Sequence, residues 1–88
     1  MLKIVATESS SGDVVLHLEG QVIGAWVEEL RQTCVPILAR GAPLALDLST
    51  VSFVNREGVG LLGCLRDRRV ALLNCSGLVA EQLKAEEG

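Results

Sequence analysis

Three glycines in the second half of the chain have the spacing of a phosphate-binding loop. Gly58, Gly60 and Gly63 follow the pattern G-x-G-x-x-G, with which dinucleotide-binding folds bring a pyrophosphate to a helix N-terminus. Such a site needs its glycines directly after a strand, but a polar segment at residues 49–54 separates them from the preceding apolar run. The next apolar run ends at Asn74, where a ribose-binding acid would be expected. We therefore interpret the glycines as packing residues of a helix and expect no cofactor.

Histidine and cysteine offer little further chemistry. His17 is the only histidine and has no second ligand or nucleophile at a useful spacing, so we expect a structural role for it and no metal site. Cys34, Cys64 and Cys75 contain no C-x-x-C pair and are expected to be buried, reduced thiols. Cys75 falls where a strand should meet a helix N-terminus, a position that favours a reactive thiolate. A small thiol enzyme using Cys75 stays an alternative, although no base is organised beside it.

Composition excludes several classes of partner. Eighty-eight residues allow one domain with one thin core. A net charge of −3 argues against binding a phosphate backbone, and two aromatic residues, Trp26 and Phe53, cannot form a stacking platform for bases. The longest charge-free stretch, residues 70–80, is much shorter than the roughly 20 residues of a membrane span. We expect a cytoplasmic protein that neither binds nucleic acid nor inserts into a membrane.

The periodicity of apolar residues predicts an α/β domain over residues 1–88. After an opening hairpin, strands and helices alternate, which is typical of a mainly parallel sheet. Pro36 is expected to kink or end the first helix, and Gly41 to stop it. The run at residues 44–48 is apolar enough for a strand covered on both sides. The expected strands are residues 2–7, 14–20, 44–48 and 70–73. The expected helices are residues 24–40, 55–69 and 76–83, and residues 49–54 are an expected loop.

The second helix carries its own start and end signals. Asn55 is a good N-cap, and Glu57 in the first turn suits the positive end of the helix dipole. Arg66, Arg68 and Arg69 suit the negative end, and we interpret them as a solvated helix terminus. The sequence therefore predicts a polar loop that leads directly into a helix beginning near residue 55.

Residues 46–62 carry a resemblance to a known family. They run from a strand of leucine and aspartate, through a segment with apolar anchors, to a helix start with glycine and leucine. This stretch resembles the signature of STAS domains, the anti-sigma-factor-antagonist family, and residues 18–20 and the order of elements are similar too. The resemblance implies a sheet of four to five mainly parallel strands with helices packed mostly on one face.

The family's phosphorylation switch has no acceptor in this chain. In phospho-switched STAS domains, a partner kinase that is itself an anti-sigma factor phosphorylates a serine at the helix start. Matched residue by residue, the family's Asp-Ser-Ser-Gly falls on Asn55, Arg56, Glu57 and Gly58. Arginine has no hydroxyl and carries a fixed charge. The resemblance therefore implies a docking module that is not phosphorylated at the family site.

We expect a non-enzymatic signalling adaptor of bacterial transcription regulation that docks a protein partner, a kinase-like anti-sigma factor or another regulator, through residues 49–60. Arg56 would be the specificity charge, or else a solvated surface residue, while Glu57 is a helix-end partner and Val54 and Val59 are apolar anchors. Alternatives are an accessory subunit of a membrane transporter ATPase and a self-associating module that forms a homodimer. The expected contact residues are Ser49, Thr50, Val54, Asn55, Arg56, Glu57, Gly58 and Val59.

Overall fold

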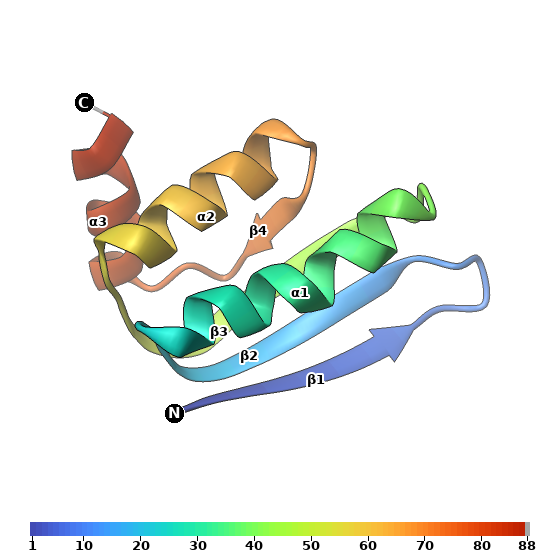
Figure 1. The fold of residues 1–88 in the computed structure, drawn as a ribbon, viewed down its shortest axis with the longest axis horizontal. Helices are drawn as coiled ribbons and strands as arrows, with labels where there is room; N and C mark the ends of the chain where they lie inside the picture. The colour runs from blue at the N-terminus through green and yellow to red at the C-terminus, as the bar shows by residue number, and fades with distance from the viewer. Residues whose placement is uncertain (88) are drawn as a thin grey trace.

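The computed structural model describes residues 1–87, and their side chains as far as Lys84. It contains four strands and three helices, in the order that the sequence predicts (Figure 1). The elements are β1 (Leu2–Glu8), β2 (Val14–Val22), α1 (Ala25–Ala39), β3 (Leu44–Val54), α2 (Arg56–Asp67), β4 (Ala71–Leu73) and α3 (Gly77–Glu87).

The sheet has the order β1-β2-β3-β4. The serine-rich turn joins β1 and β2 into an antiparallel hairpin, and β3 and β4 add in parallel, each after a helical crossover. The predicted small α/β domain with a mainly parallel sheet is thus confirmed, with four strands.

The helices gather mostly on one face of the sheet. α1 and α2 lie side by side over the central strands, and α3 packs against α2 and the end of β3 (Figure 1). The core between helices and sheet is almost entirely leucine and valine, because the sequence has so few aromatic residues. Its largest fully buried side chains include Leu16, Leu18, Leu30, Leu46, Leu48 and Leu62.

The opposite face of the sheet is open, which corrects the expectation that β3 is covered on both sides. The pairing register places Val5, His17, Asp47 and Leu73 in one row across the four strands. Val5, His17 and Leu73 are exposed and Asp47 is partly exposed. The apolar run of β3 therefore predicted its strand conformation correctly but not its environment.

β3 also corrects the expected loop at residues 49–54, which is strand throughout. The register between β2 and β3 shifts twice along this stretch, as at a β-bulge. Hydroxyl groups bond to β2 there: Thr50 Oγ1 donates to the carbonyl of Leu18 at 2.7 Å, and Ser52 Oγ donates to that of Gly20 at 3.1 Å. The polar residues that indicated a loop in the sequence thus take part in strand pairing.

The helix boundaries follow the sequence signals closely. α1 continues through Pro36 to Ala39, so the proline does not end it. Gly41 then adopts a φ of +75°, and its N–H bonds to the carbonyl of Leu38 at 3.0 Å, which is the expected helix stop. Ser76 caps α3 through a 3.3 Å bond from the N–H of Val79. Within the part of the chain that the structure describes, no helix has the length and apolar character needed to span a bilayer.

Candidate functional site

The beginning of α2 is fixed by Asn55. This residue has an extended backbone, and its side-chain Oδ1 accepts the N–H of Gly58 at 2.8 Å. Its own N–H donates to the carbonyl of Val22 on β2 at 3.2 Å, which ties the helix start to the sheet. The side chain of Asn55 therefore satisfies one of the donors that a helix N-terminus leaves unpaired. Arg56 follows as the first helical residue, as predicted.

Of the three glycines, only Gly58 has a close-packing role. A Cβ atom at Gly58 would lie 2.6 Å from both the carbonyl oxygen of Val22 and Cγ1 of Val54, closer than real Cβ atoms approach. A Cβ at Gly60 or Gly63 would meet no atom within 4 Å. The packing interpretation of the glycine motif is therefore confirmed for Gly58 and wrong for the other two positions, which are open.

The expected contact residues divide into an exposed set and a buried set. Val54 and Val59 have only 1% and 5% of their surface exposed, so they support the helix start from inside. Gly58 is buried as well. We call Arg56 and Glu57, which are exposed, together with the half-buried Asn55 the α2-start face. Ser49 and Thr50 are exposed as well, but they lie on β3 and not at the helix start.

The sequence did not predict the roles of two residues near the α2-start face. Phe53, the next-to-last residue of β3, exposes 40% of its surface. Gln82 on α3 accepts the backbone N–H of Val54 through Oε1 at 3.3 Å. No local signal in the sequence indicates this second contact, because 28 residues separate the pair.

Asp47 organises the polar part of the open sheet face. Its carboxylate accepts the backbone N–H of Ser49 at 3.0 Å and the amide of Asn74 at 3.3 Å, and it lies 3.1 Å from Nδ1 of His17. These hydrogen bonds, that of the Ser49 backbone first, hold the pKa of Asp47 well below its ordinary value. The other ring nitrogen of His17 lies 3.3 Å from Oγ1 of Thr7. The structure thus gives His17 polar partners on a flat, exposed face.

The cysteines differ from one another in exposure. Cys34 is buried, and burial raises the pKa of its thiol to about 11. Cys64 is exposed, which contradicts the expectation that all three thiols are buried, and Cys75 is half-buried. All three are free thiols. No group of three or more potential metal ligands occurs among the described residues.

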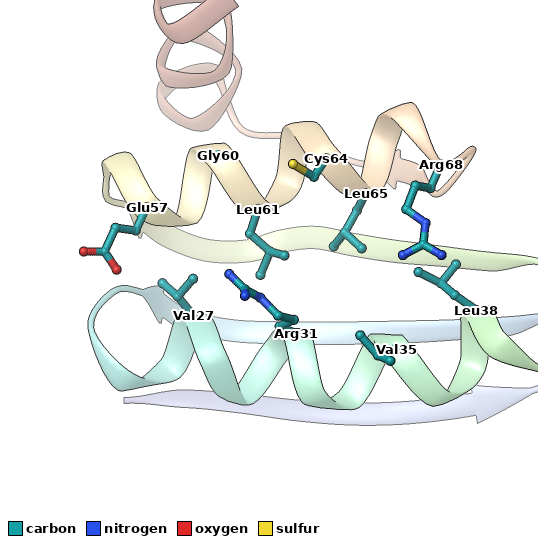
Figure 2. A pocket seen from close by; sticks show the side chains of 10 residues that line it. All are labelled: Val27, Arg31, Val35, Leu38, Glu57, Gly60, Leu61, Cys64, Leu65 and Arg68. Atoms are coloured by element: carbon teal, nitrogen blue, oxygen red, sulfur yellow. The ribbon is translucent and has the colours of Figure 1, made fainter.

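A groove of about 550 Å³ runs between α1 and α2, next to the α2-start face (Figure 2). Val27, Leu61 and Leu65 form its floor, and these three side chains are buried. Glu57 lines one end and Arg68 the other, so the groove and the α2-start face share Glu57. The sequence did not indicate this groove, because its walls come from two helices that β3 separates in the chain.

The fold and the start of α2 are those of a known family of small α/β domains. The model of the STAS domain family matches residues 5–86, nearly the whole chain, and the protein belongs to that family. A solved structure described as the anti-sigma factor antagonist SpoIIAA in its unphosphorylated form superimposes with a TM-score of 0.73. The two sequences are 24% identical, and the match covers 93% of this chain and 82% of that one, which establishes a shared fold. Among curated proteins, none matches the sequence significantly.

Proposed function

We propose that this protein is a non-enzymatic interaction module that docks a regulatory protein through the α2-start face, without a phosphorylation switch. The partner is a kinase-like anti-sigma factor or a related regulator. Membership of the STAS family and the likeness to the SpoIIAA fold support a protein-binding role. The observation that carries the proposal is that Arg56 is the first residue of α2, where the family signature has its phosphoacceptor serine.

The local geometry favours a rigid docking face. Asn55 is bonded to both β2 and α2, and Gly58 lets α2 approach the sheet closely. A face held this way loses little conformational entropy when it binds. Arg56 and Glu57 lie next to each other on this support and are exposed, so a partner meets one fixed charge of each sign.

Nearby hydroxyl groups do not replace the missing acceptor. Thr50 and Ser52 lie on β3 rather than at the helix start, and each donates to a β2 carbonyl. Phosphorylation of either hydroxyl would remove a hydrogen bond that pairs the strands. A phosphoryl group at the start of α2 would add about −1.5 to −2 charges, whereas Arg56 holds a charge of the opposite sign. The docking face is therefore permanently set.

The proposal is tested by affinity purification of the full chain from its native cell, followed by titration of the partner recovered. Arg56→Glu reverses the charge at the α2 start and is expected to weaken that binding at least tenfold. Lys3→Glu makes the same change of charge on β1 and serves as the matched control, which should bind as the wild type does. Equal affinity of Arg56→Glu and wild type would remove Arg56 from the interface. Activity of the chain alone on a small substrate would contradict the adaptor function.

A further inference from the structure

The groove between α1 and α2 is lined mostly by apolar side chains and is open to solvent. Val35 on α1 exposes 48% of its surface there, whereas Val27, Leu30 and Cys34 of the same helix are buried. Leu38 and the exposed Cys64 continue the same surface. An exposed apolar strip flanked by charged residues is typical of a protein-binding groove.

Charged residues occur along this groove in a fixed order. Figure 2 shows Glu57 at one end, Arg31 reaching from α1 toward Leu61 in the middle, and Arg68 reaching from α2 toward α1 at the other end. The pair from Glu57 to Arg68 spans 11 residues of helix, or about 16 Å. Arg31 has one ion pair, with Glu28 at 3.6 Å, in which both side chains are more than half exposed. Such exposed pairs contribute little to stability, so Arg31 can exchange Glu28 for a carboxylate of a partner.

The two helical segments that form the groove are cationic although the protein as a whole is acidic. The chain has eight basic and eleven acidic residues. The segments 25–40 and 55–69, which include α1 and α2, hold six of the basic residues but four of the acidic ones. The basic residues are Arg31, Arg40, Arg56, Arg66, Arg68 and Arg69, and the acidic ones are Glu28, Glu29, Glu57 and Asp67. These segments thus have a net charge of +2, and the rest of the chain has −5.

From this charge pattern we propose that the groove between α1 and α2 docks an acidic amphipathic helix of the partner protein. Its apolar side chains, spaced i, i+3, i+4 and i+7, would lie over Val35 and Leu61, and its carboxylates would pair with Arg31 and Arg68. A groove about 16 Å long accommodates three turns of helix. The inference rests on the proposed function, because Glu57 belongs to both the groove and the α2-start face, and one partner would cover both.

Charge also argues against a second copy of this chain as the occupant. In an antiparallel two-fold dimer of the grooves, Glu57 at one end would face Arg68 of the other protomer, but Arg31 in the middle would face its own copy. Like charges facing each other across an interface are unfavourable. An acidic helix from a different protein meets the groove with the opposite sign, and the order of charges along the groove gives it one preferred direction.

The test uses the full ¹⁵N-labelled chain and a synthetic amphipathic peptide of about 16 residues, long enough for some helix in water. The peptide carries leucine at i, i+3, i+4 and i+7 with glutamate beside them, and a matched peptide has lysine in place of each glutamate. We expect the acidic peptide, but not the lysine peptide, to produce saturable amide shifts centred on Val35, Leu38 and Cys64 of the protein. Val35→Glu and Arg68→Glu should each weaken its binding at least tenfold. Val5→Glu, at a similarly exposed valine of the open sheet face, and Lys3→Glu should leave it unchanged.

Several results would overturn the proposal. Equal binding of both peptides would do so, as would amide shifts that map outside the groove. The absence of a saturable shift up to about 1 mM peptide would also do so, because a Kd of about 1 mM corresponds to a binding free energy of only about 4 kcal/mol. The same shifts produced by decanoate alone would reassign the groove to a small aliphatic carboxylate. Dimerisation that Val35→Glu abolishes would reassign it to a second copy. With the native partner, a loss of binding in Arg56→Glu but not in Arg68→Glu would refute the groove and leave the proposed function intact.

Discussion

The N–H of Gly58 donates a 2.8 Å hydrogen bond to Oδ1 of Asn55, and the Cα of Gly58 packs so closely on β2 and β3 that no side chain fits there. These two residues flank Arg56 and Glu57, the charged pair of the α2-start face. One residue caps the helix and the other presses it onto the sheet, so the positions of both charges are determined by the core of the fold.

Removing the cap should destabilise the protein without changing its fold. We expect Asn55→Ala to lower the free energy of unfolding by about 1 kcal/mol, the usual value for a lost N-cap side chain. Asn55→Asp should retain the wild-type stability, because a carboxylate oxygen accepts the same N–H and suits the helix dipole. Urea denaturation of the three proteins measures the difference. Equal stability of Asn55→Ala and wild type would show that the Asn55 side chain does not stabilise the start of α2.

Alanine at two glycines of α2 should have opposite effects. Gly58→Ala should lower stability by about 1–3 kcal/mol, because its Cβ would overlap the Val22 carbonyl and the Val54 side chain. Gly63→Ala should raise stability by up to about 1 kcal/mol, because the added methyl meets nothing and alanine favours the helix. Thermal unfolding of both variants provides the comparison. A stabilising Gly58→Ala would contradict the close approach of α2 to the sheet.

The stability of the fold should depend on Asp47 in acid. Hydrogen bonds keep the folded-state pKa of Asp47 below its ordinary value of 3.8. The ionised carboxylate therefore stabilises the fold above pH 3.8, and this contribution is lost as the pH falls toward the folded-state pKa. Asp47→Asn should be less stable than wild type at neutral pH, with the difference shrinking below pH 3.8. Denaturation curves from pH 7 to pH 2 test this, with Glu19→Gln, an exposed carboxylate of β2, as the control. A difference that does not change with pH would contradict the argument.

Thiol labelling should follow exposure. Iodoacetamide at pH 8 should modify Cys64 first, while Cys34 stays unmodified until the protein unfolds, because its pKa is raised to about 11 and it is buried. Intact mass against time shows the number of adducts, and Cys64→Ser should lack the fast one. Rapid labelling of Cys75 in that variant at or below pH 7 would instead support the thiol-enzyme alternative.

Local signals in the sequence were enough to predict the helix starts and most of the stops, although α3 continues to Glu87 and does not end at residue 83 as expected. Asn55, Ser76 and Gly41 act through hydrogen bonds to residues three or four positions away, so residue type and spacing carry the information. The order of strands and helices followed from periodicity for the same reason. Gly58 illustrates the limit, because its pattern indicated close packing but did not separate it from Gly60, which is open.

Non-local contacts account for what the sequence did not predict. Thr50 and Ser52 were expected to be loop residues because they are polar. In the structure their hydroxyl groups donate to carbonyls of β2, each 32 residues away in the chain, and the local sequence does not indicate these partners. The pairing of His17 with Asp47 joins two strands across 30 residues. Only the sheet register brings these atoms together. The groove depends in the same way on the packing of α1 beside α2.

The most direct test of a permanently set docking face is a titration of the native partner, which we propose to be a kinase-like anti-sigma factor, with and without ATP, followed by intact-mass analysis of the chain. We predict that the wild type acquires no phosphate and that its affinity is the same in both conditions. Arg56→Ser should gain one phosphate at the introduced hydroxyl and lose affinity at least tenfold when ATP is present. Phosphorylation of the wild type within residues 49–60, with an accompanying change in its affinity for the partner, would contradict the account.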